Sequence, residues 1–202
     1  MKGNKKYESI LEESRRLFWK HGFRRVTVEE ICREANTSKM TFYRYFPNKL
    51  EVAKAVFDRV VESGMLAFRD ILEEESSAAD KMRKLLLMKL EGVHDVSKEF
   101  LSDFYGSPEL GLKDHIEVKT RQVWQGMLED FRKAQQKGIF RKDLNFEFFF
   151  YVSQKQTELI HDTYLQSLFP TAEELVMEFA NLSVYGIAPR DQNKEGLKDP
   201  DR

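Results

Sequence analysis

The sequence has few of the residues that stabilise small extracellular folds or cross membranes. Its one cysteine, Cys32, excludes a disulfide framework and a zinc site made of several cysteines. Its longest apolar run is the five residues 148–152, far short of the ~20 that a membrane-spanning helix needs. The basic residues 1–10 are followed by glutamates, where a signal peptide has an apolar core. We therefore expect a soluble, cytoplasmic protein.

Motifs that carry enzyme chemistry are also missing. The chain contains neither G-x-S-x-G nor G-x-G-x-x-G. The four histidines do not lie at metal-ligand spacing from one another; they are His21, His94, His115 and His161. We expect no catalytic residue, no metal and no cofactor. An enzyme that works without a cofactor stays open as an alternative, and would need a cleft with two titratable groups within hydrogen-bonding reach.

Apolar and aromatic residues are abundant by contrast. They include 16 phenylalanines, and 41% of the chain is apolar, whereas disordered chains are poor in aromatics. Charged residues make up 33%, so most elements must keep one face in water. A chain of 202 residues with this composition has room for a sizeable core in one or two domains.

Charge is distributed unevenly, although the formal net charge is only −1. Residues 1–50 hold 12 Lys and Arg against 6 Asp and Glu, whereas residues 51–202 hold 21 against 28. A basic segment joined to an acidic one is typical of a nucleic-acid-binding module attached to a second domain. A chance excess of solvated lysines gives the same balance, so charge raises the question without answering it.

Apolar residues recur at helical spacing almost throughout, which predicts an all-α fold. Thr27 with Glu30, Asn48 with Glu51, and Thr171 with Glu174 have the spacing of capping boxes at helix starts. The strand-like run 148–152 is assigned to a helix because the apolar pattern continues to Tyr164. We predict a linker at 73–79, a disordered tail from Pro189, and helices over residues 10–22, 27–36, 38–46, 48–72, 82–93, 100–105, 116–138, 146–168 and 171–185.

The most informative stretch is Thr27–Lys49, TVEEICREANTSKMTFYRYFPNK. It predicts two short helices joined by a tight turn at Asn36, a residue that tolerates the left-handed conformation. Phe42 and Phe46 lie one turn apart and would anchor the second helix inward. Its exposed side, with Lys39, Met40, Thr41, Tyr43 and Arg44, is then free to enter a major groove, as in a helix-turn-helix.

These residues resemble the tetracycline-repressor (TetR) family of transcriptional regulators. The family pattern is matched at Thr27, Ile31, Ala35, Ser38, Thr41, Phe42, Tyr43, Tyr45, Phe46 and Lys49. The preceding helix and Gly22-Phe23 also fit, so the resemblance covers about residues 5–60. The chain departs from the pattern at Cys32, Asn36, Thr37 and Met40. Met40 stands for a glycine on the second helix, so the family's operator preferences should not be transferred.

The resemblance implies a fold and a mode of action. Residues 1–50 would form a three-helix DNA-binding domain, and residues 51–188 a helical domain for ligand binding and dimerisation. Such proteins are homodimers that bind palindromic operators, and a small molecule usually releases them from DNA. The residues implied in DNA binding are Thr27, Ser38, Lys39, Met40, Thr41, Tyr43, Arg44 and Lys49, of which Thr27, Tyr43 and Lys49 would contact the DNA backbone.

The same resemblance places dimerisation and the effector in the second domain. The helices over 148–168 and 171–185 carry more apolar residues than one core stripe needs, and Leu175 and Phe179 are interface candidates. The effector is expected to be small and hydrophobic, neutral or cationic. Its candidate contacts are His94, Phe104, Tyr105, Trp124, Met127, Phe150, Gln154 and His161. A DNA-binding protein of the same fold without an effector remains the alternative.

Overall fold

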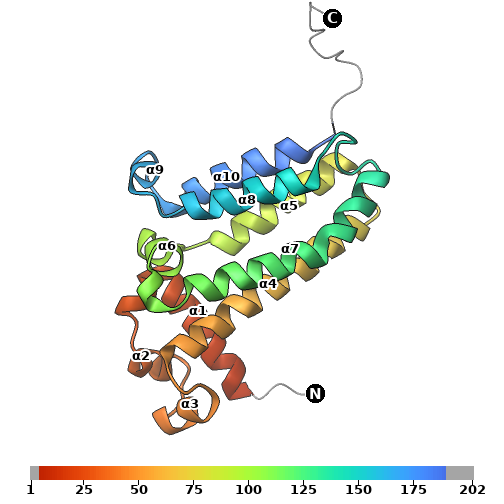
Figure 1. The fold of residues 1–202 in the computed structure, drawn as a ribbon. Helices are drawn as coiled ribbons and strands as arrows, with labels where there is room; N and C mark the ends of the chain where they lie inside the picture. The colour runs from red at the N-terminus through yellow and green to blue at the C-terminus, as the bar shows by residue number, and fades with distance from the viewer. Residues whose placement is uncertain (1–4, 190–202) are drawn as a thin grey trace, which may run out of the picture.

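The computed structural model describes residues 5–189, and within them it contains ten α-helices, one short 3-10 helix and no strand (Figure 1). The expected all-α fold is confirmed. The predicted tail lies outside the described residues from Arg190 onward. The elements are α1 (Lys5–Arg25), α2 (Val28–Glu34), α3 (Lys39–Tyr45), α4 (Lys49–Glu73), α5 (Ala78–Val93), α6 (Lys98–Tyr105), η1 (Pro108–Leu110), α7 (Lys113–Gln136), α8 (Phe146–Leu159), α9 (Thr163–Ser167) and α10 (Ala172–Ile187).

The first three helices form a compact unit at one end of the molecule (Figure 1). Thr27 and Glu30 make the expected capping box at the start of α2, and Asn36 makes the turn to α3 with a φ of 46°. Gly22 interrupts α1 at the position where the sequence predicts a helix end: its φ of 76° and ψ of 169° are not helical, and a short further segment continues beyond this kink to Arg25. The sequence therefore predicted the local signals of this unit correctly.

The apolar residues form two cores, and the long helices run through both. The first core joins α1, α2, α3 and α6 to the beginnings of α4 and α7, with Phe18, Phe42 and Phe104 fully buried. The second joins the far halves of α4 and α7 to α5, α8 and α10 around Phe68 and Phe131. Burying one such phenylalanine contributes ~1.5–3 kcal/mol. The expected domain boundary at residue 50 falls inside α4, so a continuous helix connects the two parts.

Three lysines near helix starts stabilise the ends of other helices. Lys49, at the start of α4, donates to backbone carbonyls at and just beyond the end of α1. Lys81, at the start of α5, is buried and donates to the carbonyls of Ile71 and Leu72 at the end of α4. Lys98 donates to the carbonyls of Gln166 and Phe169, at 2.7 and 3.0 Å. Terminal carbonyls have no partner within their own helix and carry partial negative charge, so an ammonium satisfies both needs.

The prediction of one continuous helix over 146–168 was wrong, because the helix is interrupted. The chain leaves the helix after Leu159 and starts α9 at Thr163. Asp162 caps the new helix by accepting a hydrogen bond from the Leu165 amide at 2.9 Å. A carboxylate that binds a backbone amide competes with helix continuation. The break positions His161 beside α6.

No helix within residues 5–189 is both long enough and apolar enough to cross a membrane.

Candidate DNA-binding and effector sites

The α2–α3 unit holds its second helix rigidly against the first core. The Ser38 hydroxyl caps α3 by accepting a hydrogen bond from the Thr41 amide at 3.1 Å. Phe42 is fully buried and Phe46 is 4% exposed, with the Phe46 ring stacked on Tyr7 of α1 at 5.3 Å. A helix of seven residues is marginal by itself, so this anchoring fixes which of its faces points outward.

The outward face of α3 carries the side chains that the sequence proposed for DNA contact. Met40 is 82% exposed and Tyr43 is 52% exposed. Lys39 forms an ion pair with Glu29 of α2, and hydrogen bonding to that carboxylate raises the pKa of the ammonium. The Arg44 guanidinium lies over the Tyr45 ring, 5.2 Å from its centre.

Thr27 is exposed at the start of α2, and its hydroxyl is engaged in the capping box. A phosphate contact from this position would use a hydroxyl that is already oriented by Glu30.

Lys49 has a different environment from the one that a phosphate contact requires. Its ammonium donates to the carbonyls of Phe23 and Val26, at 2.7 and 2.8 Å. It also lies 4.3 Å from the centre of the Phe23 ring. Burial lowers its pKa. In this conformation Lys49 closes the end of α1 against the start of α4, and its contact with DNA stays a prediction.

The three-helix unit is attached to the rest of the molecule through α6. Asp103, which is buried, accepts hydrogen bonds from the Arg24 amide at 2.8 Å and from Arg24 Nε at 3.1 Å. Arg24 also donates to the Ser107 hydroxyl at 3.1 Å. A Cβ at Gly22 would lie 2.7 Å from Asp103 Oδ2, so the glycine permits both the bend in α1 and this close approach.

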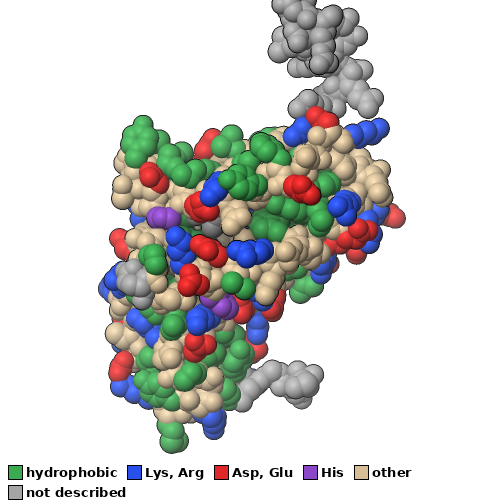
Figure 2. All heavy atoms as spheres, viewed as in Figure 1, with side chains coloured by type: hydrophobic (Ala, Val, Ile, Leu, Met, Phe, Trp, Pro, Cys, Tyr) green, Lys and Arg blue, Asp and Glu red, His purple; other side chains and the backbone are tan. Residues whose placement is uncertain are grey.

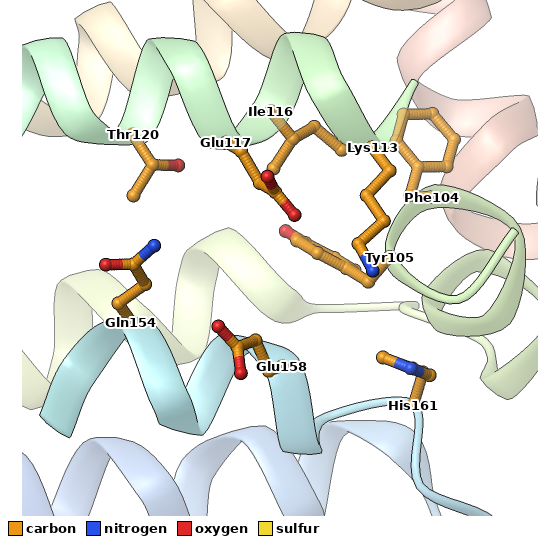
Figure 3. A pocket seen from close by; sticks show the side chains of 9 residues that line it. All are labelled: Phe104, Tyr105, Lys113, Ile116, Glu117, Thr120, Gln154, Glu158 and His161. Carbon is orange, nitrogen blue, oxygen red and sulfur yellow. The ribbon is translucent and has the colours of Figure 1, made fainter. Parts of the chain in front are cut away.

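The other face of α6 lines a hollow between α6, α7 and the end of α8 (Figure 3). The volume is about 40 Å³, enough for a few water molecules, which need ~10–15 Å³ each. The floor is apolar and polar side chains converge over it. The lining residues are Phe104, Tyr105, Lys113, Ile116, Glu117, Thr120, Gln154, Glu158 and His161.

Two polar side chains that line this hollow are His161 and Tyr105. The Nδ1 atom of His161 is buried and has no hydrogen-bond partner. Burial raises the pKa of Tyr105 to about 12, which keeps its hydroxyl protonated as a donor. Gly106 allows the His161 ring to come close to the end of α6, because a Cβ at this position would lie 2.9 Å from His161 Cδ2. A buried polar atom without a partner is costly and marks a place for a ligand or water.

The structure divides the eight expected effector contacts among three places. Phe104, Tyr105, Gln154 and His161 line the hollow. Trp124, Met127 and Phe150 lie in the second core, with Trp124 Nε1 buried and unpartnered. His94 lies away from both, in a shallow open groove with Arg15, Arg16, Trp19, Glu91 and Asp95.

Sequence reasoning missed the contribution of α7 to the hollow. Lys113, Ile116, Glu117 and Thr120 follow the spacing of one helical face. That spacing is present in the sequence, but its polar members lie outside the apolar stripe on which the helix prediction was based.

Among the described residues no group of three or more His, Cys, Asp or Glu is placed to hold a metal ion.

Comparison with known proteins agrees with this architecture. Residues 10–56 match the sequence model described as "Bacterial regulatory proteins, tetR family". The HTH-type transcriptional regulator YdgC of Bacillus subtilis is 23% identical over 195 residues, covering 94% of this chain and 96% of YdgC. YuxN of the same organism is 25% identical over 124 residues, 61% of this chain, and there the chain spans only 42% of the relative's length.

Solved structures share the fold over nearly the whole chain. The fatty acid degradation regulator FadR from Bacillus halodurans has a TM-score of 0.65 at 19% identity, covering 92% of this chain and 98% of FadR. FadR from Bacillus subtilis, in complex with stearoyl-CoA, has a TM-score of 0.59 at 17% identity, covering 90% and 99%. Residues 10–56, which hold the capped α2–α3 unit, thus form a helix-turn-helix domain of the type found in regulatory proteins of the TetR family, and the helical second part shares the fold of these solved regulators.

Proposed function

We propose that the protein is a homodimeric repressor that binds a palindromic operator in the cytoplasm and is released from it by a small hydrophobic ligand. The observation that carries this proposal is the double role of α6. Phe104 and Tyr105 line the hollow on one side, and Asp103 holds Arg24 of α1 on the other. A ligand that displaces α6 therefore acts on the helix that supports the DNA-binding unit.

DNA binding rests on the geometry of α3. Its side chains project from a helix that is capped at Ser38 and anchored at Phe42. Residues 1–50 carry an excess of basic residues, which favours contact with phosphates and predicts affinity that falls steeply with salt. Selection of bound genomic fragments with the purified protein tests this directly and identifies the operator. If no fragment is enriched at low salt, the proposal is wrong.

Dimerisation is supported by apolar side chains left in water on α8 and α10. Phe148 and Tyr151 are 64% and 61% exposed, and Leu182 and Tyr185 are 59% and 69% exposed. The Ser183 hydroxyl donates to Gln156 Oε1 at 2.9 Å, which holds the two helices side by side. Figure 2 shows apolar side chains over this layer. An apolar patch of this kind marks an interface, and packing against a twofold copy would make a four-helix bundle.

Leu175 is not part of this patch, because it is only 2% exposed. The sequence-based choice of Leu175 as an interface residue was therefore wrong, and its substitution would disrupt the protein's own core. We expect L182E combined with Y185E to yield monomers in analytical ultracentrifugation. Val118→Glu on α7, where the valine is 51% exposed, is the matched control and should leave the sedimentation coefficient unchanged. Dimers in both variants would count against this interface.

The hollow, at about 40 Å³, is too small for an effector in this conformation. A ligand-sized pocket is ~300–1,000 Å³, so α6, α7 and α8 must separate to admit one. Binding is then coupled to a change of conformation, and the ligand shifts the equilibrium by its preference for the open form. The stearoyl-CoA held by FadR of Bacillus subtilis supports a ligand with a long apolar part.

A thermal-shift screen of hydrophobic compounds tests the effector. Hits should stabilise the parent protein and weaken operator binding, and His161→Ala should reduce the shift. Trp124→Phe, in the second core, is the control and should keep it. Hits that stabilise the His161 variant as much as the parent would show that the effector binds elsewhere. A broad library without hits would favour a DNA-binding protein without an effector.

A further inference from the structure

The beginning of α3 presents an apolar side chain where a DNA-reading helix meets base edges. Met40 is the second residue of α3 and is 82% exposed. In helix-turn-helix complexes the N-terminal residues of the second helix contact the bases. Met40 thus combines a base-contacting position with a side chain that makes no strong hydrogen bond.

The polar residues around Met40 are engaged within the protein. Lys39 is paired with Glu29. The hydroxyls of Ser38 and Thr41 lie 3.0 Å apart and are hydrogen-bonded. Arg44 lies over the Tyr45 ring, one turn further along. These contacts leave Met40, with the Tyr43 ring beside it on the same helical face, as the prominent apolar feature of this surface.

The major groove offers one apolar group to such a surface. Among the edges of the four bases there, only thymine carries a methyl group, at C5. Methionine is flexible and polarizable, so it adapts to an apolar contact of this size. We propose that Met40 determines operator specificity by packing on a thymine methyl group in each half-site. This inference rests on the proposed DNA binding, and the experiment below distinguishes the failure of one from the failure of the other.

The test uses the operator obtained by genomic selection. Each symmetric pair of thymines is replaced by uracil, which removes the methyl groups and keeps the hydrogen-bonding pattern. Binding is measured by fluorescence anisotropy at one fixed salt concentration. Replacement of one particular pair should weaken the binding of the parent protein by about fourfold per half-site, as expected when one methyl group loses its apolar contact. The same replacement should have no effect on Met40→Ala, which binds both operators with the weaker affinity.

Two further variants sharpen the result. Met40→Leu keeps an apolar contact and should retain part of the preference for thymine. Met65→Ala changes a methionine of α4 that packs against the second core, and should keep the full preference. An operator whose thymines can all be replaced without loss would overturn the inference, as would a thymine preference that survives in Met40→Ala. Absence of any selected operator would instead overturn the proposed function itself.

Discussion

The N-terminal helices and the C-terminal helices of this protein bury their apolar side chains to different degrees. Phe18 and Phe42 in the first unit are fully buried, and its exposed apolar residues are confined to the reading face at Met40 and Tyr43. The last three helices leave Phe148, Leu168 and Leu182 largely in water. One chain is therefore sufficient to complete the first core, whereas α8–α10 leave an apolar face exposed, which in the proposed dimer a second copy covers.

In the proposed function the two exposed surfaces serve different partners. At one end, Met40 and Tyr43 are exposed on a capped helix that also carries the basic residues Lys39 and Arg44, as a DNA contact requires. At the other end the exposed side chains are aromatic and aliphatic, as a protein contact requires. We expect stability to follow the same division.

The largest expected effect is the loss of a buried ring from the first core. Phe42→Ala should lower the free energy of unfolding by ~3–5 kcal/mol because it leaves a cavity. The matched variant Phe148→Ala removes an exposed ring, so its effect should depend on protein concentration, through the dimer. Urea denaturation at two protein concentrations separates the two. A large loss of stability in Phe148→Ala at every protein concentration would contradict the assignment of Phe148 to an exposed surface that a second copy covers.

Lys49 and Lys39 provide a second contrast, within the DNA-binding unit. Lys49→Met should lower the free energy of unfolding by ~1.5–3 kcal/mol, because the carbonyls of Phe23 and Val26 lose a charged donor. Lys39→Met removes an exposed ion pair and should cost under ~1 kcal/mol.

Operator affinity, unlike stability, should depend more on Lys39 than on Lys49. Lys39→Met should weaken affinity strongly, and the salt dependence measured by anisotropy shows whether a phosphate contact is lost. A Lys49 variant with parental stability and a flatter salt dependence would assign Lys49 to the phosphates instead.

The link between the two parts should be weaker than either core. Asp103→Asn keeps the shape of the side chain but replaces one acceptor of the Arg24 hydrogen bonds. We expect a loss of ~1–2 kcal/mol in unfolding free energy, with reduced operator affinity. Asp114→Asn, at an exposed position on α7, is the control and should change neither. Parental operator affinity in the Asp103 variant would argue against α6 as the link.

The smallest effect concerns protonation in the hollow. Burial raises the pKa of Tyr105 to about 12 from an ordinary value of 10.0. The folded protein thus keeps a phenol proton that the unfolded chain releases. The stability contributed by this proton is complete below pH 10 and is lost as the pH rises through 12. A spectrophotometric titration should show a last phenolate step that Tyr105→Phe lacks. Ionisation of all tyrosines together near their ordinary pKa would show that the hollow is open to water.

The sequence predicted the N-terminal half well because its signals are local. The Thr27–Glu30 box, the Asn36 turn and the Phe42–Phe46 pair each act over a few residues. The break at Ile160–Asp162 was missed because the apolar pattern runs across it, while the cap at Asp162 competes with it. The environments of Lys49 and Lys81 depend on carbonyls brought near by tertiary packing. No local pattern reports such contacts, and the same holds for the approach of His161 to Gly106.

The passage of α4 through both cores has a mechanical consequence. A helix of 25 residues is about 37 Å long at 1.5 Å per residue. If the helix stays straight and pivots about its C-terminal end in the second core, a tilt of roughly 5° moves its N-terminal end by about 3 Å, close to the 3.4 Å rise between successive bases of B-DNA. Rigid transmission along α4 would thus convert a small tilt into a register error of about one base pair in each half-site.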